Sequence, residues 1–243
     1  AGFVGSVQSR YSITWGDGTS NTDMHHIVTS RSDVSGSTET DMGVYSGGWT
    51  KGLNHDYDNG TYYVFWEGSN RQGVSNTDSG ATPLVWRNEM MVRIGGDYVG
   101  NNSPVSSVPA IVTVQDNKTF TYQLNAGDRD GDNLTFRWGT INEFFDADGV
   151  ASGGTATFNM PTGMTLSTSG LISWDVRDSV LCSGCSQDDV NDVDDLWVVV
   201  IMIEDRLDNG TAKSYIPIDF FFKVTSADND PPSFTEFPTG TQT

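Results

Sequence analysis

Short strand-like segments separated by turn signals run along most of the chain, and this pattern constrains the fold more than any other feature. Residues 11–15, 61–66 and 119–124 are segments of this kind, rich in aromatic and β-branched side chains. The dipeptide Asn59-Gly60, just before the second of them, is typical of a tight turn. Long amphipathic helices are not evident, and glycine is abundant, at 27 of 243 residues. The sequence therefore predicts an all-β fold, in a chain long enough for two domains of ordinary size.

Two apolar stretches toward the C-terminal end predict strands with different surroundings. Apolar side chains alternate along residues 216–224, which is the pattern of a half-buried strand. Residues 196–203 are apolar without alternation, so we expect a loop or another protein surface to cover their outward face. No apolar run approaches the roughly 18–20 residues needed to cross a bilayer, so no membrane span is expected.

The formal net charge of -19, with only 13 Lys and Arg residues, excludes some functions. Such a chain lacks the basic face from which nucleic-acid binding gains affinity, so nucleic acid is not an expected partner. The acidic side chains either form a plain solvated surface or bind hard cations through their oxygens. No nucleophile elbow, metalloprotease helix or phosphate-binding loop occurs in the sequence, so we expect a protein that is not an enzyme.

Two motifs in the first half point to a known family. Residues 15–18 read Trp-Gly-Asp-Gly, and residues 55–64 follow the pattern His-x-Tyr-x-x-Gly-x-Tyr-x-Val. Both resemble the PKD domain, an immunoglobulin-like repeat, although the second motif departs from the family spacing by one residue. The resemblance implies a first β-sandwich over residues 1–103, which ends in a boundary loop.

The second half resembles the cadherin-like repeats of the dystroglycan type found in secreted proteins. The resemblance rests on Asp-Arg-Asp-Gly-Asp at residues 128–132, a strand-turn-strand pattern at 161–174, and Asp-Asn-Asp-Pro-Pro at 228–232. It implies a second sandwich over residues 104–227, followed by a linker or tail at 228–243 toward another domain or subunit. The expected fold is thus all-β, with two tandem immunoglobulin-like β-sandwiches. The resemblance also implies an adhesive or matrix role with rigid joints.

Asp128, Asp130 and Asp132 alternate along one loop around Gly131, and this spacing predicts calcium binding. Carboxylates so close repel one another unless a cation lies among them, and calcium accepts roughly 6–8 oxygens in loose geometry. The alternative is a solvated polar hairpin loop. The cadherin-like resemblance places this loop beside the preceding linker, which offers further ligands. These are Asp97, Asn101 and Asn102.

A second calcium site is expected at the opposite end of the second half. There Asp228, Asn229 and Asp230 resemble the next cadherin linker. Glu204 and Asp205 end the long apolar strand and are expected to approach this linker. Such a site needs a following domain to be complete.

Cys182 and Cys185 lie in a stretch rich in Gly, Ser and Asp, which favours a small loop-closing disulfide. Acidic neighbours raise a thiol pKa, so a redox site is not expected, and a zinc site lacks a second pair of ligands. The acidic run at residues 188–195 is interpreted as solvated charge. Sequons permit glycosylation, although Pro104 weakens the one at Asn101. The remaining sequons are Asn59, Asn117, Asn133 and Asn209.

These features predict an extracellular repeating unit of a cell-surface fibre, appendage or adhesin, with other copies or neighbouring domains as partners. Phe234 and Phe237 are expected to anchor the tail on such a neighbour. The alternative is a carbohydrate-binding accessory module that binds surface glycans by aromatic stacking. Its candidate rings are Trp49, Tyr62, Trp66 and Trp86. A further interpretation gathers His25, His26 and His55 with an aspartate around a metal, although His55 already fits the PKD-like motif.

Overall fold

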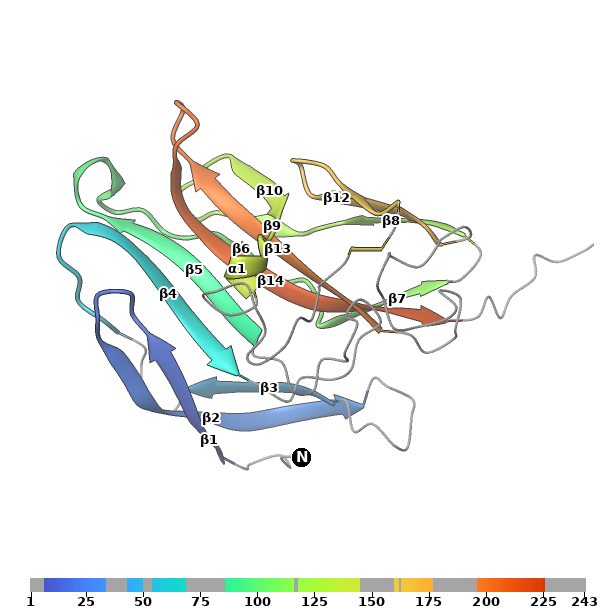
Figure 1. Cartoon of the computed structure of the whole chain (residues 1–243), viewed down its shortest axis with the longest axis horizontal. Coiled ribbons are helices and arrows are strands. Elements are labelled where there is room, and N and C mark those ends of the chain that lie inside the picture. The colour runs from blue at the N-terminus through green and yellow to red at the C-terminus, as the bar shows by residue number, and fades with distance from the viewer. Residues whose placement is uncertain are drawn as a thin grey trace, which may run out of the picture.

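The computed structural model describes residues 7–33, 43–49, 54–68, 86–115, 118–144, 160–161, 163–176 and 196–225. In these ranges nearly all regular structure is β-strand (Figure 1). The helices of the described ranges are the 3-10 turn η1 (Gly96–Tyr98) and the one-turn α1 (Ile141–Phe144). Neither is long and apolar enough to cross a membrane. The all-β prediction is confirmed.

Five strands of the first half form one antiparallel layer, in the order β5-β4-β1-β2-β3. They are β1 (Val7–Thr14), β2 (Ser20–Asp33), β3 (Gly43–Trp49), β4 (Gly60–Gly68) and β5 (Trp86–Ile94). The turn between β1 and β2 closes with a 3.0 Å hydrogen bond from the Trp15 N–H to the Thr19 carbonyl. Gly16 in this turn has a φ of +81°, and a Cβ there would lie 2.4 Å from the Tyr63 carbonyl oxygen on β4. Only glycine fits so close an approach.

Nine strands of varied length lie in the described part of the second half. They are β6 (Val105–Ser106), β7 (Ile111–Gln115), β8 (Thr119–Gln123), β9 (Ala126–Gly127), β10 (Leu134–Trp138), β11 (Thr165–Leu166), β12 (Leu171–Asp175), β13 (Leu196–Arg206) and β14 (Ala212–Thr225). β13 and β14 form a long hairpin, with β10 antiparallel to β13 and β7 parallel to β14. The strands β11, β12 and β8 form a separate sheet, and β6 pairs with β9.

The main hydrophobic core lies between the large sheet and the small sheet of the second half. Trp174 of β12 meets Trp197 of β13 edge to face, with ring centroids 6.0 Å apart. Phe120 of β8 contacts Phe222 of β14 in the same way at 5.4 Å. Trp174, Trp197 and Phe222 have no exposed surface. The second half is therefore a two-layer sandwich, as the sequence predicts.

The two halves share one sheet. β14 pairs with β5 through Ser214 opposite Val92 and Tyr215 opposite Met91, so the nine-stranded sheet crosses the predicted boundary at residue 103. Pro217 has no backbone N–H with which to continue the ladder, and the register with β5 ends before it.

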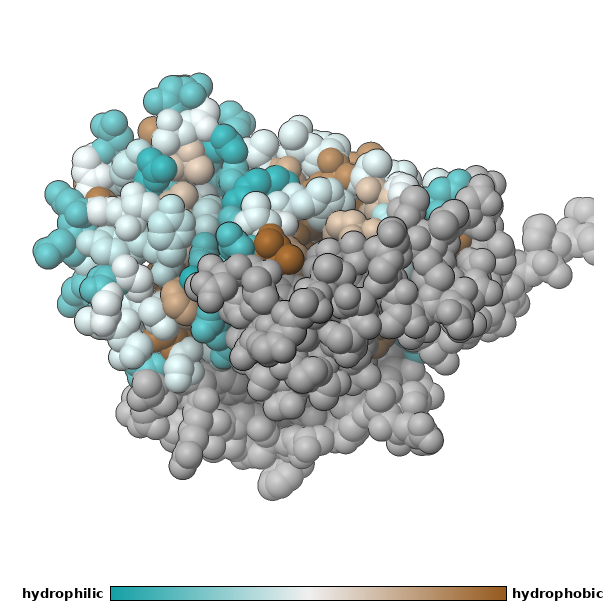
Figure 2. Space-filling model, viewed as in Figure 1, coloured by the Kyte–Doolittle hydropathy of each residue, from teal (hydrophilic) through white to brown (hydrophobic). Residues whose placement is uncertain are grey.

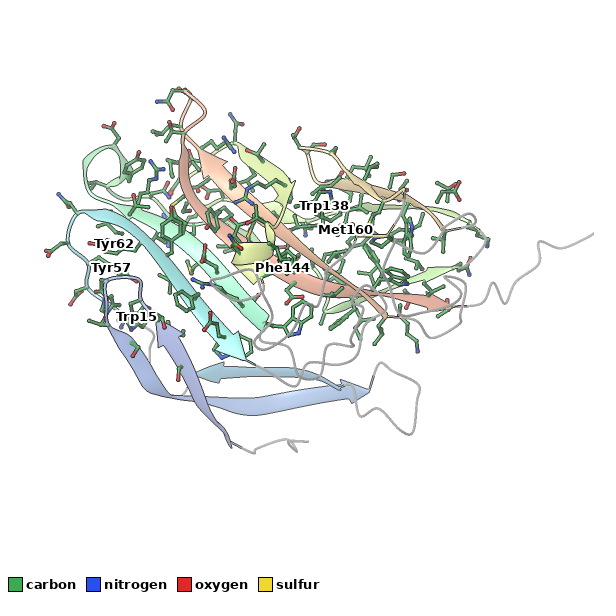
Figure 3. All side chains as sticks on the ribbon, viewed as in Figure 1. Trp15, Tyr57, Tyr62, Trp138, Phe144 and Met160 are labelled. Carbon is green, nitrogen blue, oxygen red and sulfur yellow. The ribbon has the colours of Figure 1, made fainter. Side chains whose placement is uncertain are left out.

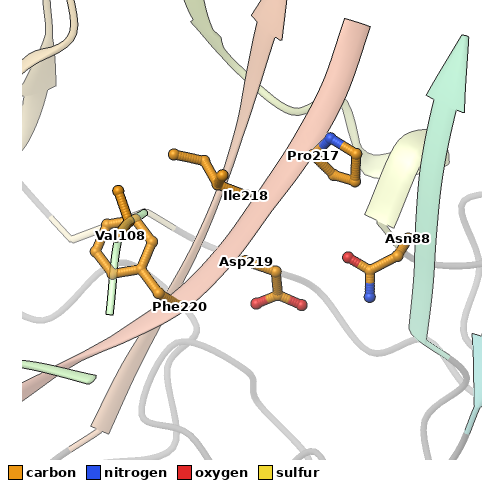
Figure 4. Close-up of a pocket in the computed structure, with 6 residues that line it drawn as sticks. All are labelled: Asn88, Val108, Pro217, Ile218, Asp219 and Phe220. Carbon is orange, nitrogen blue, oxygen red and sulfur yellow. The ribbon is translucent and has the colours of Figure 1, made fainter. Parts of the chain in front are cut away.

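Beyond this point a hollow opens between the two strands. Asn88 of β5 lines it together with Pro217 and Asp219 of β14 (Figure 4). The division of the chain into residues 1–103 and 104–227 stays a prediction. The structure adds that a short stretch of sheet pairing joins the two parts.

Both faces of β13 are buried, which explains why residues 196–203 do not alternate. Val199 and Ile201 face the main core, whereas Val198, Val200 and Met202 belong to a second cluster on the opposite face. This second cluster is completed by side chains of α1, β5 and β14, namely Phe144, Trp86, Met91 and Tyr215. The cover expected for β13 thus comes from the same chain. The tail at 231–243, with Phe234 and Phe237, lies outside the described residues.

Candidate metal site at the joint between the two halves

The Asp-Arg-Asp-Gly-Asp segment forms a tight loop between β9 and β10. Oδ1 of Asp128 accepts hydrogen bonds from the N–H groups of Asp130 at 2.7 Å and Asp132 at 3.4 Å. Gly131 takes a φ of +80°, which lets the chain turn within the loop. These bonds fix the positions from which the aspartate side chains leave the backbone.

Three carboxylates converge here, from Asp128, Asp132 and Asp205. One oxygen of each lies within 4.8 Å of the others. Oxygens bound to one calcium ion at about 2.3–2.6 Å lie at most about 5 Å apart, so this spacing suits a single ion. Asp205 reaches the cluster from β13 and has no exposed surface. The N–H and the hydroxyl of Ser214 each donate to its Oδ1 at 2.7 Å.

The linker after η1 is fastened to the same cluster. The Asn101 amide donates to Oδ2 of Asp205 at 2.7 Å. Asn102 donates through its backbone N–H and its side-chain amide to the two carboxylate oxygens of Asp130, at 2.5 and 2.7 Å. These bonds hold the pKa of Asp130 below its usual value. Asp97 lines the hollow next to them.

Two oxygens of the cluster are buried without a hydrogen-bond partner: Oδ1 of Asn101 and Oδ2 of Asp128. A buried acceptor left unpaired costs about 1–3 kcal/mol, and more when it is charged. Amide and carboxylate oxygens are the ligands that calcium prefers in proteins. The three converging carboxylates, Asp128, Asp132 and Asp205, therefore fit a hard cation. Asn101, whose amide contacts Asp205 and whose oxygen is unpaired, is a further candidate ligand.

Lys213 supplies a positive charge to the cluster and was not predicted from the sequence. Its ammonium group donates to Oδ2 of Asp132. Burial alone would lower the pKa of Lys213, but the bond to Asp132 and the charges of Asp205 and Asp128 raise it. The sequence contains a signal for the position of Lys213, the Asn209-Gly210 turn. This turn of the β13–β14 hairpin brings the start of β14 back beside Asp205.

Asp130 and Glu204, both expected to be ligands, have other partners. The Asp130 carboxylate holds Asn102, so this residue positions the linker beside the cluster. Glu204 accepts from Nε of Arg137 at 2.6 Å and also pairs with Arg206.

The expected grouping of Glu204 and Asp205 at the far end of the second half is wrong. Adjacent residues of a strand point to opposite faces, so the two side chains separate. Asp205 lies opposite Ser214 near the start of β14, whereas that strand ends at Thr225. Asp228, Asn229 and Asp230 lie outside the described residues.

A salt-bridge network on the Glu204 face has a structural role. Arg137 donates to both carboxylate oxygens of Glu143 at 2.7 Å and also to Glu204. Burial alone would raise the pKa of Glu143, but the bonds from Arg137 and Thr140 lower it. The network ties α1 to β10 and β13 above the second hydrophobic cluster.

The motif residues of the first half form a packed aromatic corner, seen around Trp15, Tyr57 and Tyr62 in Figure 3. His55 stacks on Trp15 with centroids 4.7 Å apart, and Tyr62 stacks on Tyr57 at 4.3 Å. The Tyr57 hydroxyl donates to the Trp15 carbonyl at 2.9 Å, and burial raises the pKa of Tyr57 to about 12. Nε2 of His55 lies 2.7 Å from Oδ2 of Asp17. This corner gives the motif a structural explanation.

The remaining candidate residues either lie away from the metal site or fall outside the described residues. Trp86 is only 2% exposed and stacks with Phe144, so it belongs to the interior. Trp66 stays partly exposed, and the coloured surface in Figure 2 is mainly hydrophilic or neutral. Exposed sequons occur at Asn59, Asn133 and Asn209. Candidates whose side chains lie outside the described residues are His25, His26, Trp49, Asn117, Cys182, Cys185 and the run at 188–195.

Comparison with known proteins gave no family and one distant structural likeness. No family model and no curated protein matches the sequence. A crystal structure of the two tandem V-type regions of VCBP3, a v-region-containing chitin binding protein, aligns over 89% of this chain and 87% of its own. The identity is 14% and the TM-score is 0.35. What the chain does must therefore follow from its own residues.

Proposed function

We propose that this chain is an extracellular structural or adhesive segment whose two halves are fixed against each other by calcium at their joint. One observation supports this most. Carboxylate oxygens of Asp128, Asp132 and Asp205 lie within 4.8 Å of one another. The linker residue Asn101 donates to Asp205, and one oxygen each of Asn101 and Asp128 is buried without a partner. An ion bound there connects the segment between the halves to two elements of the second half.

A joint of this kind has a mechanical purpose. Among the described residues, the direct sheet pairing between the halves consists of two residue pairs. Trp86 and Met91 of β5 also pack on the second half, in the second hydrophobic cluster. An ion held by the linker adds bonds that are lost only when the linker leaves the second half. Ordered joints suit a repeating unit of a fibre, appendage or adhesin that contacts other copies or neighbouring domains.

Calorimetric titration with calcium tests this function. Asp128→Asn and Asn101→Ala each remove a ligand oxygen or its charge, so each is expected to weaken binding by roughly tenfold or more. Asp208→Asn removes an equal charge from the exposed tip of the β13–β14 hairpin and is expected to leave the affinity unchanged. A chain that binds no calcium, or whose affinity falls equally in all three variants, would contradict the proposal.

Glycan binding is the second candidate, and Trp66 gives it some support. This ring lines an open apolar hollow with Ile13, Val64, Met90 and Pro217. Such a surface can accept the apolar face of a sugar ring. Trp66→Ala should then abolish binding on a glycan array, whereas a chain that binds no glycan leaves only the structural function.

A further inference from the structure

Lys213, at the start of β14, places its ammonium group among the carboxylates of the joint. The residue is 8% exposed, and the ammonium group pairs with Asp132. The charges of Asp205 and Asp128 act on the same group. An ammonium ion is strongly hydrated, so its burial requires carboxylate partners such as these.

Calcium and this ammonium group compete for the same carboxylates. Two positive charges within one small, partly buried cluster repel each other strongly, because water screens them poorly there. We infer that Lys213 is a built-in competitor, whose ammonium group partly neutralises the joint in the absence of calcium and is displaced when calcium binds. This inference rests on the function proposed above and adds how the site is regulated.

The structure offers the displaced ammonium group a second partner. Lys213 lines an open hollow together with Asn101 and Asp130. Asp130 is exposed, and the charge of Lys213 already acts on its carboxylate. Because a lysine side chain is long and flexible, a change of rotamer can carry its ammonium group from Asp132 toward Asp130. Calcium then replaces the ammonium group of Lys213 at Asp132, and the ammonium group pairs with Asp130 instead.

Calcium titration of the Lys213→Gln variant measures this competition. Removing the ammonium group removes the cost of displacing it, so the variant is expected to bind calcium roughly tenfold more tightly than the unmodified chain. Without calcium the variant is expected to melt at a lower temperature, because Asp132 has lost its counter-charge. Lys118→Gln is the matched control, since it removes the same charge just before the start of β8 and is expected to change neither property.

The outcomes separate the inference from the proposed function. Equal calcium affinities of Lys213→Gln and the unmodified chain would overturn the inference and leave the metal site in place. No binding by either chain would contradict the proposed function, and the inference with it. Mass spectrometry of the intact chain gives a further outcome that would overturn the inference, a mass lower by one water molecule than the sequence predicts. Such a loss would mean that Lys213 and Asp132 have condensed to an amide, which leaves no ammonium group to displace.

Discussion

Asp205 shows how a fully buried carboxylate is held in the joint. Its Oδ1 accepts two hydrogen bonds from Ser214, and its Oδ2 accepts one from Asn101. Each oxygen carries further acceptor capacity, so these bonds orient the group and still permit a cation to bind. Replacing Asp205 would leave buried donors unpaired, and the loss of folding would mask the loss of calcium. Asp128, whose Oδ2 has no donor, is the better residue for testing metal binding.

Asp17 in the aromatic corner predicts a local dependence of stability on acid. Hydrogen bonds from Thr19 and His55 lower the pKa of Asp17 from 3.8 to about 2. A carboxyl group whose pKa is depressed in the folded state stabilises it above the unfolded pKa, and this contribution is lost as the pH falls through the folded pKa. Asp17→Asn is therefore expected to melt at a lower temperature than the unmodified chain near neutral pH. The difference in melting temperature is expected to shrink as the pH falls from 3.8 toward 2.

Melting curves across this acid range check the prediction. Asp56→Asn, which changes an exposed carboxylate in the segment that carries His55, serves as the control and is expected to leave the curves unchanged. A melting difference for Asp17→Asn that stays constant with pH would show that the ionised carboxylate of Asp17 is not what stabilises the fold.

At the scale of single elements, local patterns predicted strands better than they predicted strand neighbours. The Asp-x-Asp-x-Asp spacing places Asp128 and Asp132 in one loop, and the structure brings both to the cluster. Asp205 was assigned to the wrong end of the second half, because strand ends are distinguished only once the partner strand is known. The hairpin register that sets Asp205 opposite Ser214 depends on both strands and their turn.

β13 gives the sharpest prediction at this scale, because adjacent residues face two separate clusters. Ile201 and Met202 are both fully buried, one in each cluster. Ile201→Ala and Met202→Ala are each expected to lower the free energy of unfolding by about 2–5 kcal/mol. In a half-buried strand, truncating only one of two adjacent residues would lower the free energy of unfolding by this much.

Chemical denaturation measures both changes. Leu171→Ala on β12 is the matched control, since its side chain is 41% exposed and its truncation is expected to cost much less. A small effect of Met202→Ala, comparable to that control, would mean that the second cluster does not support the fold in solution.

At the scale of the whole molecule, the chain is all-β as its turns and strands predict, yet its halves are joined in a way that no local pattern shows. Tyr215 of β14 pairs with Met91 of β5, although more than half of the sequence separates them. No local pattern around either residue predicts this pairing. The resemblance to cadherin-like repeats placed the linker beside the Asp loop, and Asn101 and Asn102 do contact that region. Calcium at this joint stays a prediction.

Hydrogen exchange with and without calcium tests the central claim most directly, since it reports on the linker and the Asp loop in the same sample. A single ion bound by both is expected to slow amide exchange in residues 97–102 and in residues 128–132 together. The turn at residues 15–18 is the internal reference and is expected to exchange at the same rate in both samples. Slower exchange in only one of the two segments, or in neither, would contradict a joint held by calcium.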